Sequence, residues 1–329
     1  MYQALKNLSP TQQVGALFVL VFGLLLLATS ITFLLSMREM DDSAQAQSRK
    51  KALNDVQALL GTSWTLIFVF WIAWLASDIT RLVLFALGSF FALREFLTLS
   101  PTRQGDHRSL VLTFFAVLPF QYWLVGTEQF SLFTVFIPVY VFLTLPVASA
   151  LANDPQRFLE RNAKLQWGIM VCVYGMSHVP ALLLLKFPHY DQKNAFLVFF
   201  LVLVVQTCML TQHLVARYSP SPPAADNISH SFNWNSWSWG MAAGSLLGAL
   251  LAGVTPFVPG QAFAMAFIAC AAGSLGHLVM KALKRDRGIP IWRDQGKGVT
   301  GAGGMLDRID SLCFAAPVFF HSMRWYFDL

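Results

Sequence analysis

Charged side chains are scarce in this sequence. Only 12% of the 329 residues are Asp, Glu, Lys or Arg, whereas roughly 25% is usual in a soluble domain. Apolar residues make up 56% of the chain, so the composition excludes an ordinary soluble domain and predicts a membrane protein. The formal net charge is +6, but the positive residues lie in loops between apolar runs. This placement favours contact with membrane lipids and phosphate over binding of nucleic acid.

Cysteine is scarce as well. The four cysteines each lie inside an apolar run, and none belongs to a CxxC pair. We therefore expect small buried side chains rather than a zinc site or a set of disulfides. A cleavable signal peptide is not expected, because the first apolar run is too long and lacks a small-residue cleavage pattern. That run is predicted to be a retained span.

Long apolar runs dominate the chain and predict an all-α fold, a polytopic transmembrane helical bundle of about ten spans. Residues 1–329 are expected to form a single membrane-embedded domain. Within it, 1–60 would supply an extra N-terminal span and an amphipathic cytoplasmic segment, and 200–329 a catalytic-type C-terminal half. The predicted spans are 14–37, 61–79, 80–98, 109–126, 129–151, 166–187, 194–212, 236–258, 261–281 and 310–327.

The distribution of lysine and arginine predicts the orientation of these spans. With both termini outside, 18 of the 23 lysines and arginines fall in inside loops. The positive-inside rule favours this arrangement, in which the loop 282–309 faces the cytoplasm. We therefore expect an integral protein of a bacterial inner (cytoplasmic) membrane.

Three glycines spaced by four residues, Gly240, Gly244 and Gly248, form a ridge on one predicted span. Small residues at this spacing let a neighbouring helix approach closely. Packing within the chain is the favoured interpretation, and a homodimer contact is the alternative.

The densest charge cluster is the segment 281–311, which precedes and enters the last span. Lys284, Arg285 and Arg287 follow the ninth span and could either anchor it to anionic headgroups or hold phosphates. The glycine-rich stretch 296–304 exposes backbone N–H groups that can cradle an anion, although a flexible loop is the simpler interpretation.

Two aspartates, Asp307 and Asp310, stand three residues apart at the start of the last span, so they share a helix face. Carboxylates placed in this way can bind a divalent cation such as Mg²⁺. Capping of the helix N-terminus explains one aspartate well and two less well. With Arg308 between them and basic residues upstream, the cluster indicates a site for phosphates and a metal, as nucleotidyl transfer requires.

The order of these residues resembles the C-terminal motif of the phosphatidate cytidylyltransferases (CDP-diacylglycerol synthases), polytopic membrane enzymes that use Mg²⁺ to condense CTP with phosphatidic acid. The resemblance implies CTP and phosphatidic acid, or a related lipid phosphate, as partners and Mg²⁺ as cofactor. It implies that Asp307, Asp310 and Asp294 are catalytic. Asp307 and Asp310 would also bind the metal, with His277 as a further candidate ligand. It implies these phosphate-binding residues: Lys284, Arg285, Arg293, Arg308, Gly303 and Gly304.

The sequence also departs from the family pattern. Ala302 stands where the family has histidine, the pair Gly276-His277 replaces a Gly-Asp pair, and the stretch 229–234 lacks the lysine of its family counterpart. Three alternatives therefore stay open: a homologue that binds anionic lipid or nucleotide without turnover, a cytidylyltransferase for another lipid phosphate, and a transporter. Intramembrane ionisable residues such as His178, with Asp78 and Glu95 near span ends, would mark a transport path.

Overall fold

The computed structural model describes residues 10–37, separate positions between 57 and 72, and residues 77–98, 103–187, 190, 194–219, 221–229, 231–288 and 304–328. These belong to two compact units, 1–75 and 76–329. The described residues form helices joined by short loops and contain no strand beyond one isolated bridge between Ala225 and Ser229. The predicted all-α fold is confirmed.

The first unit contains one long helix, α2 (Pro10–Met37), over the predicted first span. Trp64 contacts this helix: its ring meets the Phe22 ring edge-on at 4.9 Å, and its Nε1 donates to Thr29 Oγ1 at 3.1 Å. The predicted amphipathic segment 38–60 lies almost entirely outside the described residues. The predicted span 61–79 is described at separate positions up to residue 72, which are helical, and again from residue 77.

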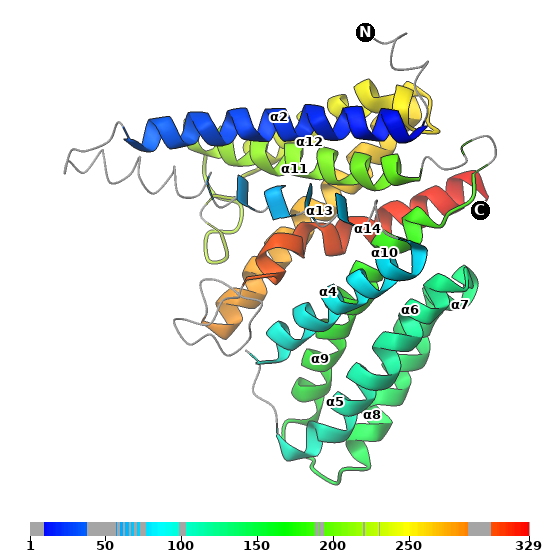
Figure 1. The fold of residues 1–329 in the computed structure, drawn as a ribbon. Helices are drawn as coiled ribbons and strands as arrows, with labels where there is room; N and C mark the ends of the chain where they lie inside the picture. The colour runs from blue at the N-terminus through cyan, green and yellow to red at the C-terminus, as the bar shows by residue number, and fades with distance from the viewer. Residues whose placement is uncertain are drawn as a thin grey trace. The chain divides into compact units, whose positions relative to one another are not determined.

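The second unit is a bundle of helices (Figure 1). Several of these helices continue through π-helical turns. Its helices are α4 (Asp78–Thr98), α5 (His107–Leu112), α6 (Leu118–Gly126), α7 (Phe130–Val135), α8 (Phe142–Ala150), α9 (Phe158–Ile169), α10 (Met176–Leu183), α11 (Ala195–Tyr218), α12 (Trp234–Leu250), α13 (Pro259–Arg287) and α14 (Leu306–Phe327). π-helical turns at Thr113–Val117, Phe136–Val141 and Met170–Gly175 join α5 to α6, α7 to α8 and α9 to α10.

Among the described residues of the second unit, five helices are long and apolar enough to cross a membrane: Gln104–Gly126, Phe130–Ala150, Ala195–Tyr218, Trp234–Val254 and Pro259–Arg287. Each coincides with a predicted span. The protein is therefore an integral membrane protein, and the total of ten spans stays a prediction. The predicted span 166–187 begins earlier than expected, because α9 starts at Phe158 and carries charged side chains that the sequence suggested were loop residues.

The glycine ridge on α12 packs inside the chain. A Cβ at Gly240 would lie 2.7 Å from the Cys208 carbonyl oxygen of α11, and one at Gly244 would lie 2.5 Å from Cys270 Sγ of α13. A Cβ at Gly248 would lie 2.3 Å from the Ala266 Cβ, also on α13. The favoured interpretation of the ridge therefore accounts for it fully, and a homodimer stays a prediction.

The last helix, α14, is held closely on two sides. It packs against α13, and it also contacts α4, α10 and α11 (Figure 1). A Cβ at Gly175 would lie 2.3 Å from the Cys313 carbonyl oxygen, and one at Gly276 would lie 2.4 Å from the Phe314 Cβ. Only glycine permits these approaches, so Gly175 and Gly276 let α14 pack closely against the turn Met170–Gly175 and against α13.

Candidate functional site

The candidate site lies where α13 ends and α14 begins. The last turn of α13 carries Lys284, Arg285 and Arg287, and the helix closes on Gly288 with a φ of 67°. Basic side chains in a last turn interact favourably with the helix dipole, and glycine readily adopts the left-handed closing conformation. The two helices are paired along their lengths, so these cations lie beside the start of α14.

Lys284 and Asp307 form an ion pair across the two helices. The Lys284 Nζ donates to Asp307 Oδ1, and the two side chains are only 12% and 22% exposed. Partial removal from water strengthens their attraction beyond that of an exposed surface pair. The predicted phosphate ligand and the strongest predicted carboxylate are thus brought together.

His277 and Asp310 form a second pair, with His277 lying two helical turns before Lys284 on α13. The His277 Nδ1 lies 2.7 Å from Asp310 Oδ2, and the other carboxylate oxygen accepts from the Ser311 backbone N–H at 2.6 Å. Asp310 is buried, with a side chain that is 5% exposed, whereas the His277 side chain is 25% exposed. Both carboxylate oxygens of Asp310 therefore have partners from the chain.

Three of the residues of α13 with basic side chains lie on one face. His277, Lys281 and Lys284 are spaced four and three residues apart, the spacing at which side chains of a helix align. Lys281 Nζ donates to Ser229 Oγ at 3.3 Å. Ser229 begins the stretch whose family counterpart carries a lysine, so Lys281 places an ammonium group beside a segment that lacks one in sequence. Sequence reasoning missed Lys281, although its spacing from Lys284 was a usable signal.

Glu95 of α4 is the second residue that sequence reasoning did not assign to the site. Its Oε1 accepts from the Gly304 N–H at 2.8 Å, and its Oε2 accepts from the N–H groups of Met305 and Leu306 at 3.0 and 3.2 Å. Glu95 is 1% exposed and lies 209 residues before Gly304. A buried carboxylate from a distant helix thus caps the N-terminus of α14, a role that the sequence offered only as the alternative interpretation of Asp307 and Asp310.

The remaining predicted site residues fall into three groups. Arg285 and Arg308 are exposed and adjoin Lys284 and Asp307 in the sequence. Gly304 has a φ of 80° and gives its N–H to Glu95, so this group is not directed at a phosphate. Arg293, Asp294 and Gly303 lie outside the described residues.

The described carboxylates do not by themselves fit a magnesium ion. Mg²⁺ prefers several oxygen ligands in octahedral geometry, and no three His, Cys, Asp or Glu side chains are grouped for a metal within the described part of the chain. Asp307 is paired with Lys284, and the oxygens of Asp310 are paired with His277 and the Ser311 N–H. The expected metal stays a prediction.

A further charged cluster joins the loops next to the end of α4. The buried Arg161 donates from Nη1 to Asp154 Oδ2 at 2.6 Å, and its Nε lies 3.3 Å from Asp106 Oδ1. Arg103 Nε also donates to Asp154 Oδ2 at 3.0 Å. The hydrogen bond from Arg161 holds the pKa of the Asp154 carboxyl below its usual value. This cluster fixes the segment 103–108 against 151–161.

Comparison with known proteins gives consistent findings. The cytidylyltransferase family matches residues 56–326. The chain is 32% identical over 309 residues to the uncharacterized protein YnbB of Escherichia coli (strain K12), which covers 93% of this chain and 96% of that protein. It is 28% identical over 173 residues to the phosphatidate cytidylyltransferase of Mycobacterium leprae, covering 51% of this chain and 52% of the relative. A segment of 45 residues is 51% identical to the phosphatidate cytidylyltransferase of Thermotoga maritima, covering 14% of this chain and 16% of the relative.

Proposed function

This chain belongs to the cytidylyltransferase family, and from that premise we propose that it transfers the cytidylyl group of CTP to phosphatidic acid. In this reaction an oxygen of the lipid phosphate attacks the α-phosphorus of CTP and forms a new P–O bond. The bond from the α-phosphorus to the bridging oxygen of the β-phosphate breaks, and pyrophosphate leaves. The products are CDP-diacylglycerol and pyrophosphate.

The observation that carries this proposal is the cluster of basic side chains where α13 ends and α14 begins. Lys284 is fixed by Asp307, and the exposed Arg285 and Arg308 adjoin these two residues in the sequence. Transfer of a phosphate-linked group depends mainly on positioning and on neutralising charge, which clustered cations supply. A lysine whose ammonium group is held by a carboxylate needs little reorganisation to meet a phosphate.

The place of the site suits two substrates of different solubility. Both the end of α13 and the start of α14 adjoin long apolar helices, so a lipid phosphate can arrive from the bilayer and CTP from the aqueous phase. The proposal puts this surface on the cytoplasmic side of a bacterial inner membrane, as the distribution of lysine and arginine favours. A requirement for Mg²⁺ belongs to the proposal through the family resemblance, with Asp307 and Asp294 as the first ligands to test.

The decisive experiment measures CDP-lipid formation from labelled CTP and phosphatidate by the purified full-length protein in detergent. We expect product from the wild-type protein, loss of product on chelation of divalent cations, and a loss of at least about 100-fold in the Asp307→Asn variant. The matched control is Asp286→Asn, because Asp286 is an aspartate of the same cluster whose side chain is 70% exposed. Equal activity of the wild-type protein and the Asp307→Asn variant would refute the assignment of the site.

A second candidate is a homologue that binds nucleotide or anionic lipid without turnover. It is favoured by the complete pairing of Asp310, whose oxygens are engaged by His277 and the Ser311 N–H. Saturable CTP binding without product, with several lipid phosphates as acceptors, would establish it. Product with only one other lipid phosphate would instead establish a cytidylyltransferase of different lipid specificity.

A further inference from the structure

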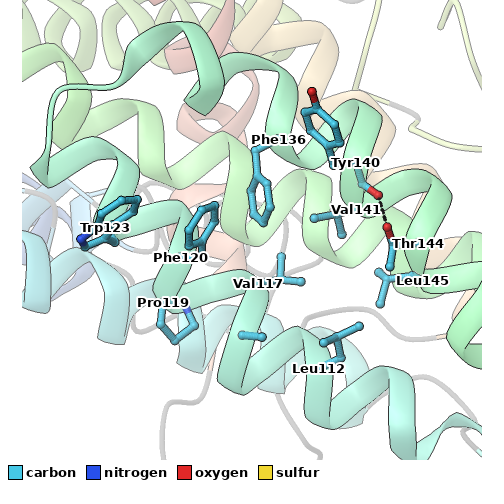
Figure 2. Close-up of a pocket in the computed structure, with 11 residues that line it drawn as sticks. Leu112, Val117, Pro119, Phe120, Trp123, Phe136, Tyr140, Val141, Thr144 and Leu145 are labelled. Atoms are coloured by element: carbon cyan, nitrogen blue, oxygen red, sulfur yellow. Dashed lines mark hydrogen bonds between the residues drawn. The ribbon is translucent and has the colours of Figure 1, made fainter.

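An apolar groove lies between the helices Gln104–Gly126 and Phe130–Ala150 (Figure 2). Its volume is about 560 Å³, within the range of ligand pockets, which runs from roughly 300 to 1,000 Å³. One wall carries Leu112, Ala116 and Phe120, and the other carries Phe136, Tyr140 and Thr144. The Thr144 hydroxyl donates to the Tyr140 carbonyl oxygen and so turns its polar group back into its own helix.

Irregular helical geometry accompanies the groove. Each wall contains a π-helical turn, at Thr113–Val117 and Phe136–Val141, and Pro119 interrupts the regular backbone bonding of the first wall. Such features are frequent where a helix serves a function. The groove thus lies where both helices depart from regular packing.

The surroundings of the groove identify the chemistry of its occupant. Side chains of the same two helices that point away from the groove are apolar, with Phe115 76%, Leu143 65% and Val147 58% exposed. Exposed apolar surface of this extent is stable in lipid and costly in water. Because both helices are long and apolar enough to cross the membrane, the medium around the groove is hydrocarbon. An acyl chain is the ligand that this medium supplies.

A basic residue lies one helical turn beyond one end of the groove. Arg108 lies one turn before Leu112, which lies one turn before Ala116, so Arg108 continues the stripe that forms the wall. The Arg108 side chain is exposed, and its Nη1 donates to the Leu151 carbonyl oxygen at 3.2 Å, just past the end of the helix that carries the other wall. A guanidinium group at the end of a membrane helix lies at the depth of lipid headgroups, where it can bind a phosphate.

We propose that this groove binds one phospholipid with an anionic headgroup, its acyl chain between the two helices and its phosphate on Arg108. The groove is built from α5 to α8, whereas the candidate reaction site is built from α4, α13 and α14. The proposal therefore does not depend on the cytidylyltransferase activity. It assigns to the hairpin a lipid site of its own.

The test is native mass spectrometry of the full-length protein, delipidated in detergent and then titrated with phosphatidylglycerol or phosphatidylcholine. We expect one phosphatidylglycerol to be retained in preference to phosphatidylcholine. Ala116→Phe fills the groove and abolishes this retention. Arg108→Gln weakens it by roughly fivefold, the change expected when one basic residue is removed at an anionic surface.

Two matched controls accompany these variants. Leu143→Phe adds a ring to an outward-facing position on the same hairpin, and Arg157→Gln removes an arginine that is 79% exposed in the adjoining loop. Both are expected to retain lipid as the wild-type protein does. Retention unchanged by Ala116→Phe, or equal retention of both lipids, overturns the proposal. Because Ala116 is exposed, the larger side chain is accommodated without repacking the core, and a thermal melt verifies the fold of each variant.

Discussion

Removal of the Glu95 carboxylate should loosen the start of α14. The Glu95→Ala variant leaves three N–H groups, of Gly304, Met305 and Leu306, without their acceptor. A lost cap costs about 0.5–2 kcal/mol, and a buried unsatisfied donor about 1–3 kcal/mol. Since Gly304 and Met305 are only half-buried and can recover some hydration, we expect a total loss of about 2–4 kcal/mol.

The Glu95→Gln variant separates the cap from the charge. Its amide oxygen can replace the oxygen that accepts from Met305 and Leu306, whereas its amide nitrogen would face the Gly304 N–H. We therefore expect an intermediate loss of about 1–2 kcal/mol. The matched control is Glu128→Ala, which removes a carboxylate from an exposed pair with Lys186 and should cost about 0–1 kcal/mol.

The assay is SDS-driven unfolding in mixed micelles, followed by tryptophan fluorescence. Hydrogen exchange of the backbone amides of residues 304–310 supplies a local measurement that does not depend on enzyme activity. Faster exchange there in Glu95→Ala, but not in Glu128→Ala, is the expected pattern. A Glu95→Ala variant as stable as Glu128→Ala, with unchanged exchange at 304–310, would refute the cap.

Three further changes test other parts of the structure. Gly175→Ala should lower the free energy of unfolding by about 1–3 kcal/mol, because its Cβ would lie 2.3 Å from the Cys313 carbonyl oxygen. Gly244→Val should also lower the melting temperature while the mass in detergent, measured by light scattering, stays unchanged; a change in mass would show that the ridge joins two chains. The folded pKa of Asp154 lies below its usual 3.8, so this carboxylate stabilises the fold above that pH and loses its contribution as pH falls through the folded value. Asp154→Asn should therefore reduce the melting temperature at neutral pH, where Arg161 loses one of its two carboxylate partners, and flatten its decline toward acidic pH.

The spans were predictable because lipid demands long apolar runs, which a sequence displays directly. Element ends were less predictable where tertiary contacts decide them. Arg161 and Lys164 are charged and were expected in a loop, yet both lie on α9 because Asp154 and Glu160 supply their counter-charges. The glycine ridge was correctly expected to pack within the chain, since small residues at a spacing of four leave few other uses.

The candidate site was predictable in composition but not in pairing. The motif indicated which side chains gather near Asp307, because its residues are close in sequence. It could not indicate that Lys284 pairs with Asp307 and that His277 pairs with Asp310, because this pairing depends on how α13 and α14 are aligned. The role of Glu95 could not be predicted for a different reason: a cap supplied from 209 residues away leaves no local pattern in the sequence.

The contact between Glu95 and α14 also has a consequence for biosynthesis. Gly304 is synthesised 209 residues after Glu95, so throughout that stretch of translation the Glu95 carboxylate has none of the three donors that later surround it. A carboxylate without partners resists transfer into an apolar interior. The end of α4 therefore has to stay hydrated, at the membrane surface, until α14 has been made. The candidate site therefore assembles only after α14 has been made, and a chain truncated before residue 304 would leave Glu95 without these three donors.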